Sequence, residues 1–110
     1  MVYSYNMCKN MENDRNYILK IALCDDDLNN IKLVAKLLED EISKQDLSAK
    51  IVLITSDQDK ILKAISHREI DVLFLDIDFK NGGKNGLEFA TILRKVNKEF
   101  FLIFLTAHQR

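Results

Sequence analysis

The stretch Asp71-Val72-Leu73-Phe74-Leu75-Asp76-Ile77-Asp78 decides how this chain folds. Its apolar centre, residues 72–75, is too short for a helix, and valine and phenylalanine favour strands. An apolar run without alternation predicts a strand that is buried on both faces, as in a parallel sheet. Asp76 would then end the strand, at the edge where open α/β sheets form their binding sites.

The composition is that of a single globular domain. The 110 residues match the usual domain size, and 47% of them are apolar and 30% charged. A net charge of −1 argues against nucleic acid or a membrane surface as a direct partner. The sequence contains no apolar run long enough to span a membrane and no secretory signal, and Cys8 and Cys24 fit no metal-ligand spacing. We therefore expect a cytoplasmic protein.

Strands and helices are predicted to alternate along the chain. Strands are expected at residues 18–24, 51–54, 72–75 and 100–105. The first helix is expected at residues 28–44, the second begins after Ser56, which is its expected cap, and the third begins at Gly86. This order requires right-handed crossovers and a parallel sheet. Residues 1–17 are polar and rich in asparagine, so we expect a disordered extension before a domain over residues 18–110. The expected buried helix residues are Leu28, Ile31, Val34, Ala35, Leu38, Ile42, Ile61, Leu62, Ile65, Leu87, Phe89, Ala90, Leu93 and Val96.

Polar groups are expected where three of these strands end: the pair Asp25 and Asp26, then Asp76, then Thr106. Carboxylates that are brought together repel one another, so one binds a proton or a cation joins them. Mg²⁺ suits such a site because it prefers one or two carboxylates together with phosphate oxygens. The pattern predicts phosphoryl transfer onto Asp76, with Thr106 donating a hydrogen bond to a phosphoryl oxygen. The plain alternative is that the run Asp25 to Asp27 only caps a helix, and that Asp76 and Thr106 only end strands.

Four segments, taken together, resemble the receiver domain of bacterial two-component response regulators. They are Leu23-Cys24-Asp25-Asp26-Asp27, Leu73-Phe74-Leu75-Asp76-Ile77, Asn85-Gly86-Leu87-Glu88 and Phe104-Leu105-Thr106-Ala107, in receiver-like order and spacing. The resemblance covers about residues 18–110. It implies a flavodoxin-like α/β fold, in which a doubly wound parallel sheet has the strand order 2-1-3-4.

The resemblance also implies a function in two-component signal transduction. A sensor histidine kinase would donate a phosphoryl group, and the domain would relay it by a conformational change to its own or a separate output domain. The domain would not be an enzyme in the usual sense, because it catalyses only its own phosphorylation and dephosphorylation. The implied site residues are the phosphoacceptor Asp76, the Mg²⁺ ligands Asp25, Asp26, Asp76 and the backbone carbonyl of Asp78, the switch hydroxyl of Thr106, and Ala107 beside the phosphoryl group.

Two departures from the common receiver pattern narrow the interpretation. The loop 78–84 is longer than in most receivers and, with Thr106-Ala107-His108, is similar to receivers that precede LytTR-type DNA-binding domains, which implies transcription regulation. A receiver also has a fifth strand, ending in a lysine, and two further helices, and this sequence ends before them. We therefore expect an incomplete receiver whose strand 100–105 forms an apolar edge that favours a homodimer.

Two other functions fit the same residues. A phosphatase fragment of haloacid-dehalogenase type would use Asp76 as the nucleophile, Asp78 as the general acid and Thr106 in its second motif, but it leaves Asp25 and Asp26 without a role. A degenerate receiver would act only by binding proteins. The absent lysine favours that reading, and the intact acidic pair opposes it.

Overall fold

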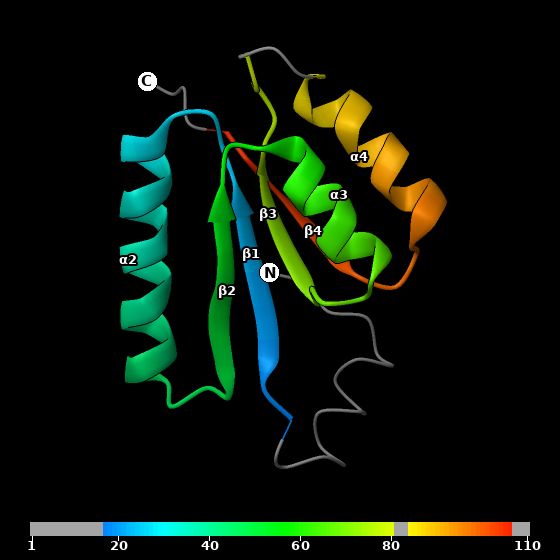
Figure 1. The fold of residues 1–110 in the computed structure, drawn as a ribbon. Coiled ribbons are helices and arrows are strands. Elements are labelled where there is room, and N and C mark those ends of the chain that lie inside the picture. Colours follow the sequence, from blue (N-terminus) through cyan, green and yellow to red (C-terminus); the bar gives the residue numbers. More distant parts are fainter. Residues whose placement is uncertain (1–16, 81–83, 107–110) are drawn as a thin grey trace.

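The computed structural model describes residues 17–80 and 84–106, which form one four-stranded parallel sheet with three helices (Figure 1). The strand order is β2-β1-β3-β4, so the predicted order 2-1-3-4 is confirmed. The elements in chain order are β1 (Leu19–Cys24), α2 (Leu28–Lys44), β2 (Ala49–Thr55), α3 (Gln58–Ser66), β3 (Val72–Asp76), α4 (Gly86–Val96) and β4 (Phe101–Leu105).

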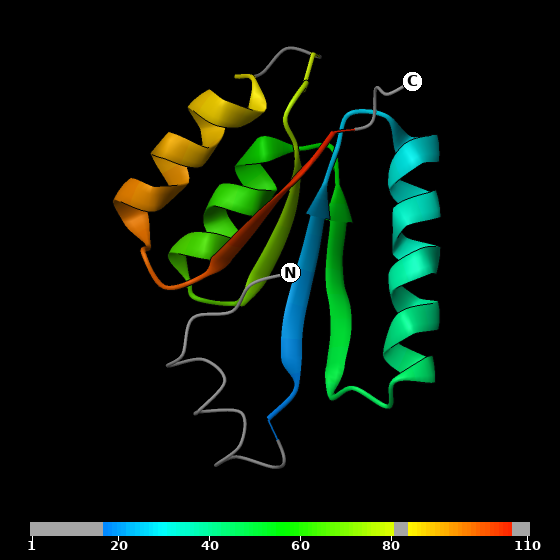
Figure 2. The same cartoon turned by 180° about the vertical axis from the view of Figure 1, so that it is seen from behind.

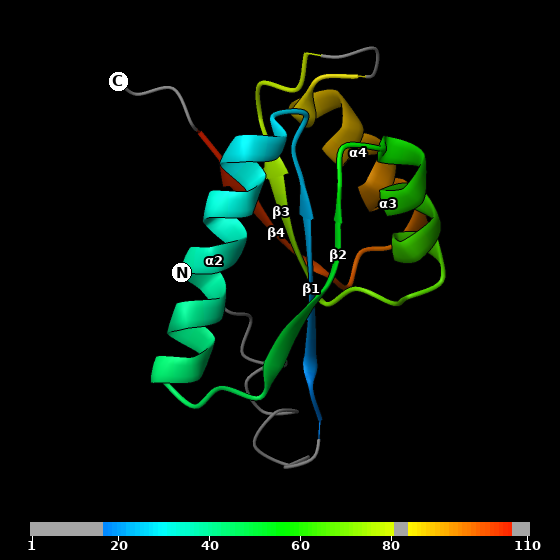
Figure 3. The ribbon, with the colours of Figure 1, turned by 60° about the vertical axis from the view of Figure 1, so that its left-hand side comes forward.

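Helices cover both faces of the sheet, and two apolar clusters fill the space between the layers. Helix α2 lies on one face, and α3 and α4 lie on the other (Figures 1 and 3). One cluster packs the side chains of α3 and α4 against the sheet, and the second packs α2 against it. The buried anchors are Leu73, Leu75, Ile61, Ile65 and Leu93 in the first cluster and Leu23, Ile31 and Val72 in the second.

Strand β3 is buried on both faces, as its apolar run predicts. It pairs with β1 through Val72–Leu75 and with β4 along its whole length. Strand β4 forms the end of the sheet opposite β2, and seen from behind it crosses in front of β3 at an angle (Figure 2). Because β1 and β3 are neighbours and parallel, the residues that follow Cys24 and those that end β3 meet at one edge of the sheet.

The structure corrects two details of the second strand and helix. Strand β2 spans Ala49–Thr55, three residues longer than expected, and its half-buried and exposed residues alternate because β2 is an edge strand. The cap of α3 is Asp57, not Ser56, because its side chain accepts a hydrogen bond from the amide of Asp59 at 2.9 Å.

Three apolar residues that the helical period predicts in the core are exposed. Leu28 is 52% exposed, Leu87 55% and Val96 47%, although each fits the apolar period of its helix. All three lie at helix ends: Leu28 begins α2, Leu87 is the second residue of α4 and Val96 is its last. Periodicity identifies a helix face, but only the position of the sheet decides how much of that face is covered.

Tyr17 joins the start of the described chain to the sheet. Its hydroxyl donates a hydrogen bond to Asp71 at 2.5 Å, and its carbonyl accepts one from the hydroxyl of Ser48 at 2.7 Å. The expectation of disorder for residues 1–16 lies outside the described residues. Among the described helices, none is long and apolar enough to cross a bilayer.

Candidate functional site

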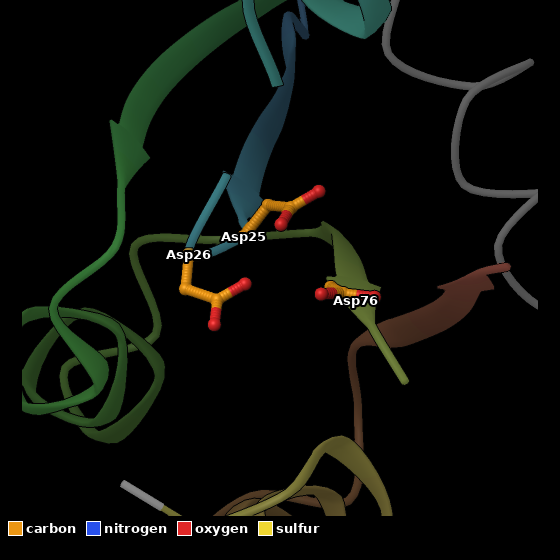
Figure 4. Close-up of side chains that lie close together, drawn as sticks. All are labelled: Asp25, Asp26 and Asp76. Atoms are coloured by element: carbon orange, nitrogen blue, oxygen red, sulfur yellow. The ribbon is translucent and has the colours of Figure 1, made fainter. Parts of the chain in front are cut away.

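Three carboxylates meet at the carboxyl edge of the sheet. Asp25 and Asp26 follow β1, Asp76 ends β3, and one oxygen from each lies within 4.8 Å of the others. Figure 4 shows the three side chains around a common space. Asp25 and Asp76 are buried and Asp26 is partly buried. The sequence therefore predicted correctly which acids the fold brings together.

Asp25 is held by the start of helix α2. One of its oxygens accepts a hydrogen bond from the amide of Asp27 at 2.9 Å, and the other accepts one from the side-chain amide of Asn30 at 2.8 Å. Asp27 itself caps α2, accepting from the amides of Asn29 and Asn30. Both readings of the acidic run thus hold, since Asp27 is the cap and Asp25 belongs to the cluster.

Asn30 is a residue of this site that the sequence motifs do not identify. Asparagine has a low helix propensity because its side chain competes for nearby backbone groups, so an asparagine inside a predicted helix suggests that the side chain has a local partner. That is the signal that could have identified it, because Asn30 lies one turn after the acidic run. Its side-chain amide orients the Asp25 carboxylate through this hydrogen bond.

The surroundings of Asp76 disfavour its charge. Burial, and then the neighbouring charges of Asp25 and Asp26, raise its pKa from 3.8 to about 6, although a hydrogen bond from the amide of Asp78 (3.0 Å) acts in the opposite direction. A divalent cation removes such repulsion. The donor set is entirely oxygen and carries up to three negative charges, which fits a hard ion such as Mg²⁺.

The first residues after β3 contact this edge. The amide of Lys80 donates a hydrogen bond to the Asp26 carboxylate at 2.6 Å. An open hollow of about 490 Å³ lies beside it and is lined by Asp26, Asp27, Leu28, Asn29 and Lys80. The acidic edge is therefore accessible from solvent on the side of α2.

Helix α4 begins directly against the backbone of the site. The amide of Gly86 donates a hydrogen bond to the carbonyl of Ile77 at 3.2 Å, and Asn85 and Glu88 form a capping box. A Cβ on Gly86 would lie 2.4 Å from the carbonyl oxygen of Asp76 and 2.6 Å from the Cα of Ile77. Only glycine allows this approach, which explains the Asn-Gly pair at the start of the helix.

Thr106 follows β4 at the same edge of the sheet. Asp76 pairs with Leu105 in the sheet register, so Thr106 is one residue beyond the partner of Asp76, and its side chain is exposed. Asp78 is also exposed and follows Asp76 by two residues. Ala107, which the resemblance places beside the phosphoryl group, lies outside the described residues.

Comparisons with solved structures agree with this architecture. The signal receiver domain of a modulated diguanylate cyclase from Desulfovibrio desulfuricans G20 has a TM-score of 0.61 and 18% identity, over 84% of this chain and 68% of that chain. The anti-anti-sigma factor PhyR from Bartonella quintana has a TM-score of 0.63 and 13% identity, over 94% of this chain and 38% of that chain. Identities this low show a shared flavodoxin-like receiver fold. Among curated proteins, no similar sequence was found.

The family is shown by the sequence itself. The profile of the response regulator receiver domain matches residues 21–110, which include β3, β4 and all three carboxylates. The strand order and the cluster at the ends of β1 and β3 are those the receiver resemblance implies. The chain therefore belongs to the response regulator receiver domain family.

Proposed function

We propose that this receiver accepts a phosphoryl group on Asp76 from a sensor histidine kinase, with Mg²⁺ held by the same acidic cluster. The observation that carries the proposal is the convergence of Asp25, Asp26 and Asp76, with oxygens within 4.8 Å, in a member of the receiver family. Helix capping alone does not require this convergence, because Asp27 already caps α2.

In the transfer step, a carboxylate oxygen of Asp76 attacks the phosphorus of a phosphohistidine on the kinase. The new P–O bond forms as the P–N bond breaks, and the imidazole nitrogen keeps the electron pair and takes a proton. With its pKa at about 6, Asp76 is largely ionised at neutral pH and can act as the nucleophile. Hydrolysis of the acyl phosphate by water later restores the carboxylate.

The remaining residues position the reacting groups. Asp25, Asp26, Asp76 and the backbone carbonyl of Asp78 would hold Mg²⁺, which when bound supplies positive charge against the carboxylates and the phosphoryl oxygens. Thr106 would donate its hydroxyl to a phosphoryl oxygen and transmit the change to β4. Ala107 would leave room for the phosphoryl group. The domain would then act as a switch and not as an enzyme that turns over a separate substrate.

The test is intact mass after incubation with Mg²⁺ and acetyl phosphate, which supplies the phosphoryl group without a kinase. We expect a single phosphoryl adduct that requires Mg²⁺, is released by hydroxylamine as an acyl phosphate, and is absent in Asp76→Asn. Asp78→Asn is the matched control, since it removes an equal charge two residues away and is expected to keep the adduct.

This experiment and an assay for phosphate-ester hydrolysis together separate the competing functions. No adduct in a folded wild type would favour a degenerate receiver that only binds proteins. Sustained hydrolysis of phosphate esters that is lost in Asp78→Asn would favour the phosphatase of haloacid-dehalogenase type. The convergence of Asp25 and Asp26 on Asp76 supports the receiver mechanism, because the phosphatase assigns those two acids no role.

We further propose a cytoplasmic regulator whose output domain binds DNA and is of LytTR type. The support is the length of the loop 78–84 and the residues Thr106-Ala107-His108. The apolar edge strand β4, which pairs with β3 on one side, would favour a homodimer. Sedimentation across a range of protein concentrations, with and without acetyl phosphate, tests the dimer.

A further inference from the structure

The side-chain amide of Gln58 is paired with the main chain of a residue far along the sequence. Its Nε2 donates a hydrogen bond to the carbonyl of Lys84 at 2.7 Å, and its Oε1 accepts one from the amide of Lys84 at 3.1 Å. The two residues are 26 positions apart. Gln58 thus satisfies both main-chain groups of Lys84, as a neighbouring strand would.

Gln58 lies at a helix start that is fixed by hydrogen bonds. It is the first residue of α3 and is partly buried. The helix start is fixed on either side of it, because the amide of Asp57 donates to the hydroxyl of Thr55 at the end of β2 (3.0 Å) and the Asp57 carboxylate caps the amide of Asp59 (2.9 Å). Since Asp57 is the cap, the amide of Gln58 is not needed for capping and can hold another segment.

Lys84 lies in the connection between β3 and α4, and residues on both sides of it in the sequence contact the acidic cluster or its backbone. That connection leaves β3 with the amide of Asp78 on Asp76, and the amide of Lys80 then binds Asp26. It enters α4 at Gly86, which lies against the backbone of Asp76. Lys84 stands two residues before Gly86, so Gln58 holds the start of α4 where it contacts the backbone of Asp76 and Ile77.

We infer that Gln58 is a positioning residue of the acidic site, which acts through the main chain of Lys84. The inference rests on the proposed function, since it concerns how firmly the cluster holds a divalent cation. With Lys84 fixed, Gly86 stays against the main chain of Asp76 and Ile77. The Asp76 carboxylate, which accepts from the amide of Asp78, is then held in place before the cation binds. Without Gln58, the start of α4 loses a contact that holds it against the backbone of Asp76.

The experiment compares Gln58→Ala and Gln58→Met with wild type. Methionine keeps the length of the side chain and removes both hydrogen bonds, so it separates their effect from packing. Gln45→Ala is the matched control, because Gln45 is an exposed glutamine at the far end of α2. Affinity is measured as free Mn²⁺ by electron paramagnetic resonance, since Mn²⁺ takes the same oxygen ligands as Mg²⁺. The Mg²⁺ dependence of the acetyl phosphate adduct is measured in parallel.

We expect both Gln58 variants to bind Mn²⁺ about fivefold more weakly. This is less than the roughly tenfold to hundredfold effect of residues that contact metal ligands directly, because Gln58 acts through the main chain. They should need correspondingly more Mg²⁺ for half-maximal phosphorylation and reach the wild-type extent at saturation. Gln45→Ala should match wild type. Faster hydrogen exchange at the Lys84 amide would confirm that the hydrogen bond from this amide to residue 58 is lost in the variants.

Three outcomes would overturn the inference. Both variants could bind Mn²⁺ as tightly as wild type while the Lys84 amide exchanges faster. This result would mean that the two hydrogen bonds between Gln58 and Lys84 only stabilise the fold. A loss of phosphorylation that persists at saturating Mg²⁺ would mean that the site or the fold is damaged instead of loosened. If wild type itself bound no Mn²⁺ and formed no adduct, the proposed function would fail as well, so the two failures are distinguishable.

Discussion

Replacing Asp76 by asparagine should stabilise the protein when no divalent cation is present. The side chain is buried, and its oxygen that accepts from the amide of Asp78 has an equivalent in asparagine, so the change removes chiefly the charge. The pKa of Asp76 is raised from 3.8 to about 6, and the difference of about 2 pKa units corresponds to about 3 kcal/mol at 1.36 kcal/mol per unit.

The size of this effect changes with pH in a defined window. A pKa that is higher in the folded state means that the folded protein holds the proton more tightly. The contribution of this proton to the free energy of unfolding is therefore fully present below pH 3.8 and is lost as the pH rises through about 6. At pH 8 the full cost is present, and Asp76→Asn should gain about 3 kcal/mol. At pH 4.5 the same two pKa values leave a gain of about 1 kcal/mol.

The assay is urea unfolding of wild type and Asp76→Asn at both pH values in EDTA. A thermal melt at pH 8 should show the midpoint of the variant about 10–20 °C higher, because a domain of this size shifts by several degrees per kcal/mol. Asp78→Asn serves as the control, since its side chain is exposed and surface substitutions usually change stability by less than about 0.5 kcal/mol.

Two results would refute this reasoning. A variant that is equally or less stable than wild type at pH 8 would show that Asp76 bears no net cost from burial and repulsion. An equal gain at both pH values would assign the effect to packing. Adding Mg²⁺ should narrow the gap by stabilising wild type, by about 2.7 kcal/mol when the ion is a hundredfold above its Kd.

Three further predictions concern residues around the site and the core. Gly86→Ala should destabilise the fold by about 1–3 kcal/mol in urea unfolding, because its Cβ would lie 2.4 Å from the Asp76 carbonyl oxygen; an unchanged midpoint would contradict this. Asn97→Ala should cost about 1–3 kcal/mol in the same assay, because it removes three hydrogen bonds at once: its side-chain amide donates to the Ile65 carbonyl at 3.1 Å, and its oxygen accepts from the Glu99 amide at 2.8 Å and from the Arg68 guanidinium at 3.2 Å. Burial and nearby acids raise the pKa of Cys24 to about 12, so peptide mapping should find it unmodified by iodoacetamide until urea unfolds the chain; rapid labelling in the native state would be inconsistent with its burial.

Local chemistry is sufficient to place the elements and the acids that end them. The apolar run 72–75 specifies a doubly buried strand, and a change of period after Leu28 specifies a helix, because both signals repeat within a few residues. The alternation of the two kinds of element then leaves a parallel sheet. The meeting of Asp25, Asp26 and Asp76 at one edge therefore follows from local patterns and the order of the elements.

Tertiary structure alone decides which residues support that edge. Gln58 and Lys84 are 26 positions apart, and Lys80 and Asp26 are 54 apart, so no local pattern in the sequence relates them. The exposure of Leu28 and Leu87 is decided in the same way, by how far each helix extends past the sheet. Periodicity describes one element at a time, whereas the hydrogen bonds that orient the carboxylates join elements that meet only after the sheet has formed.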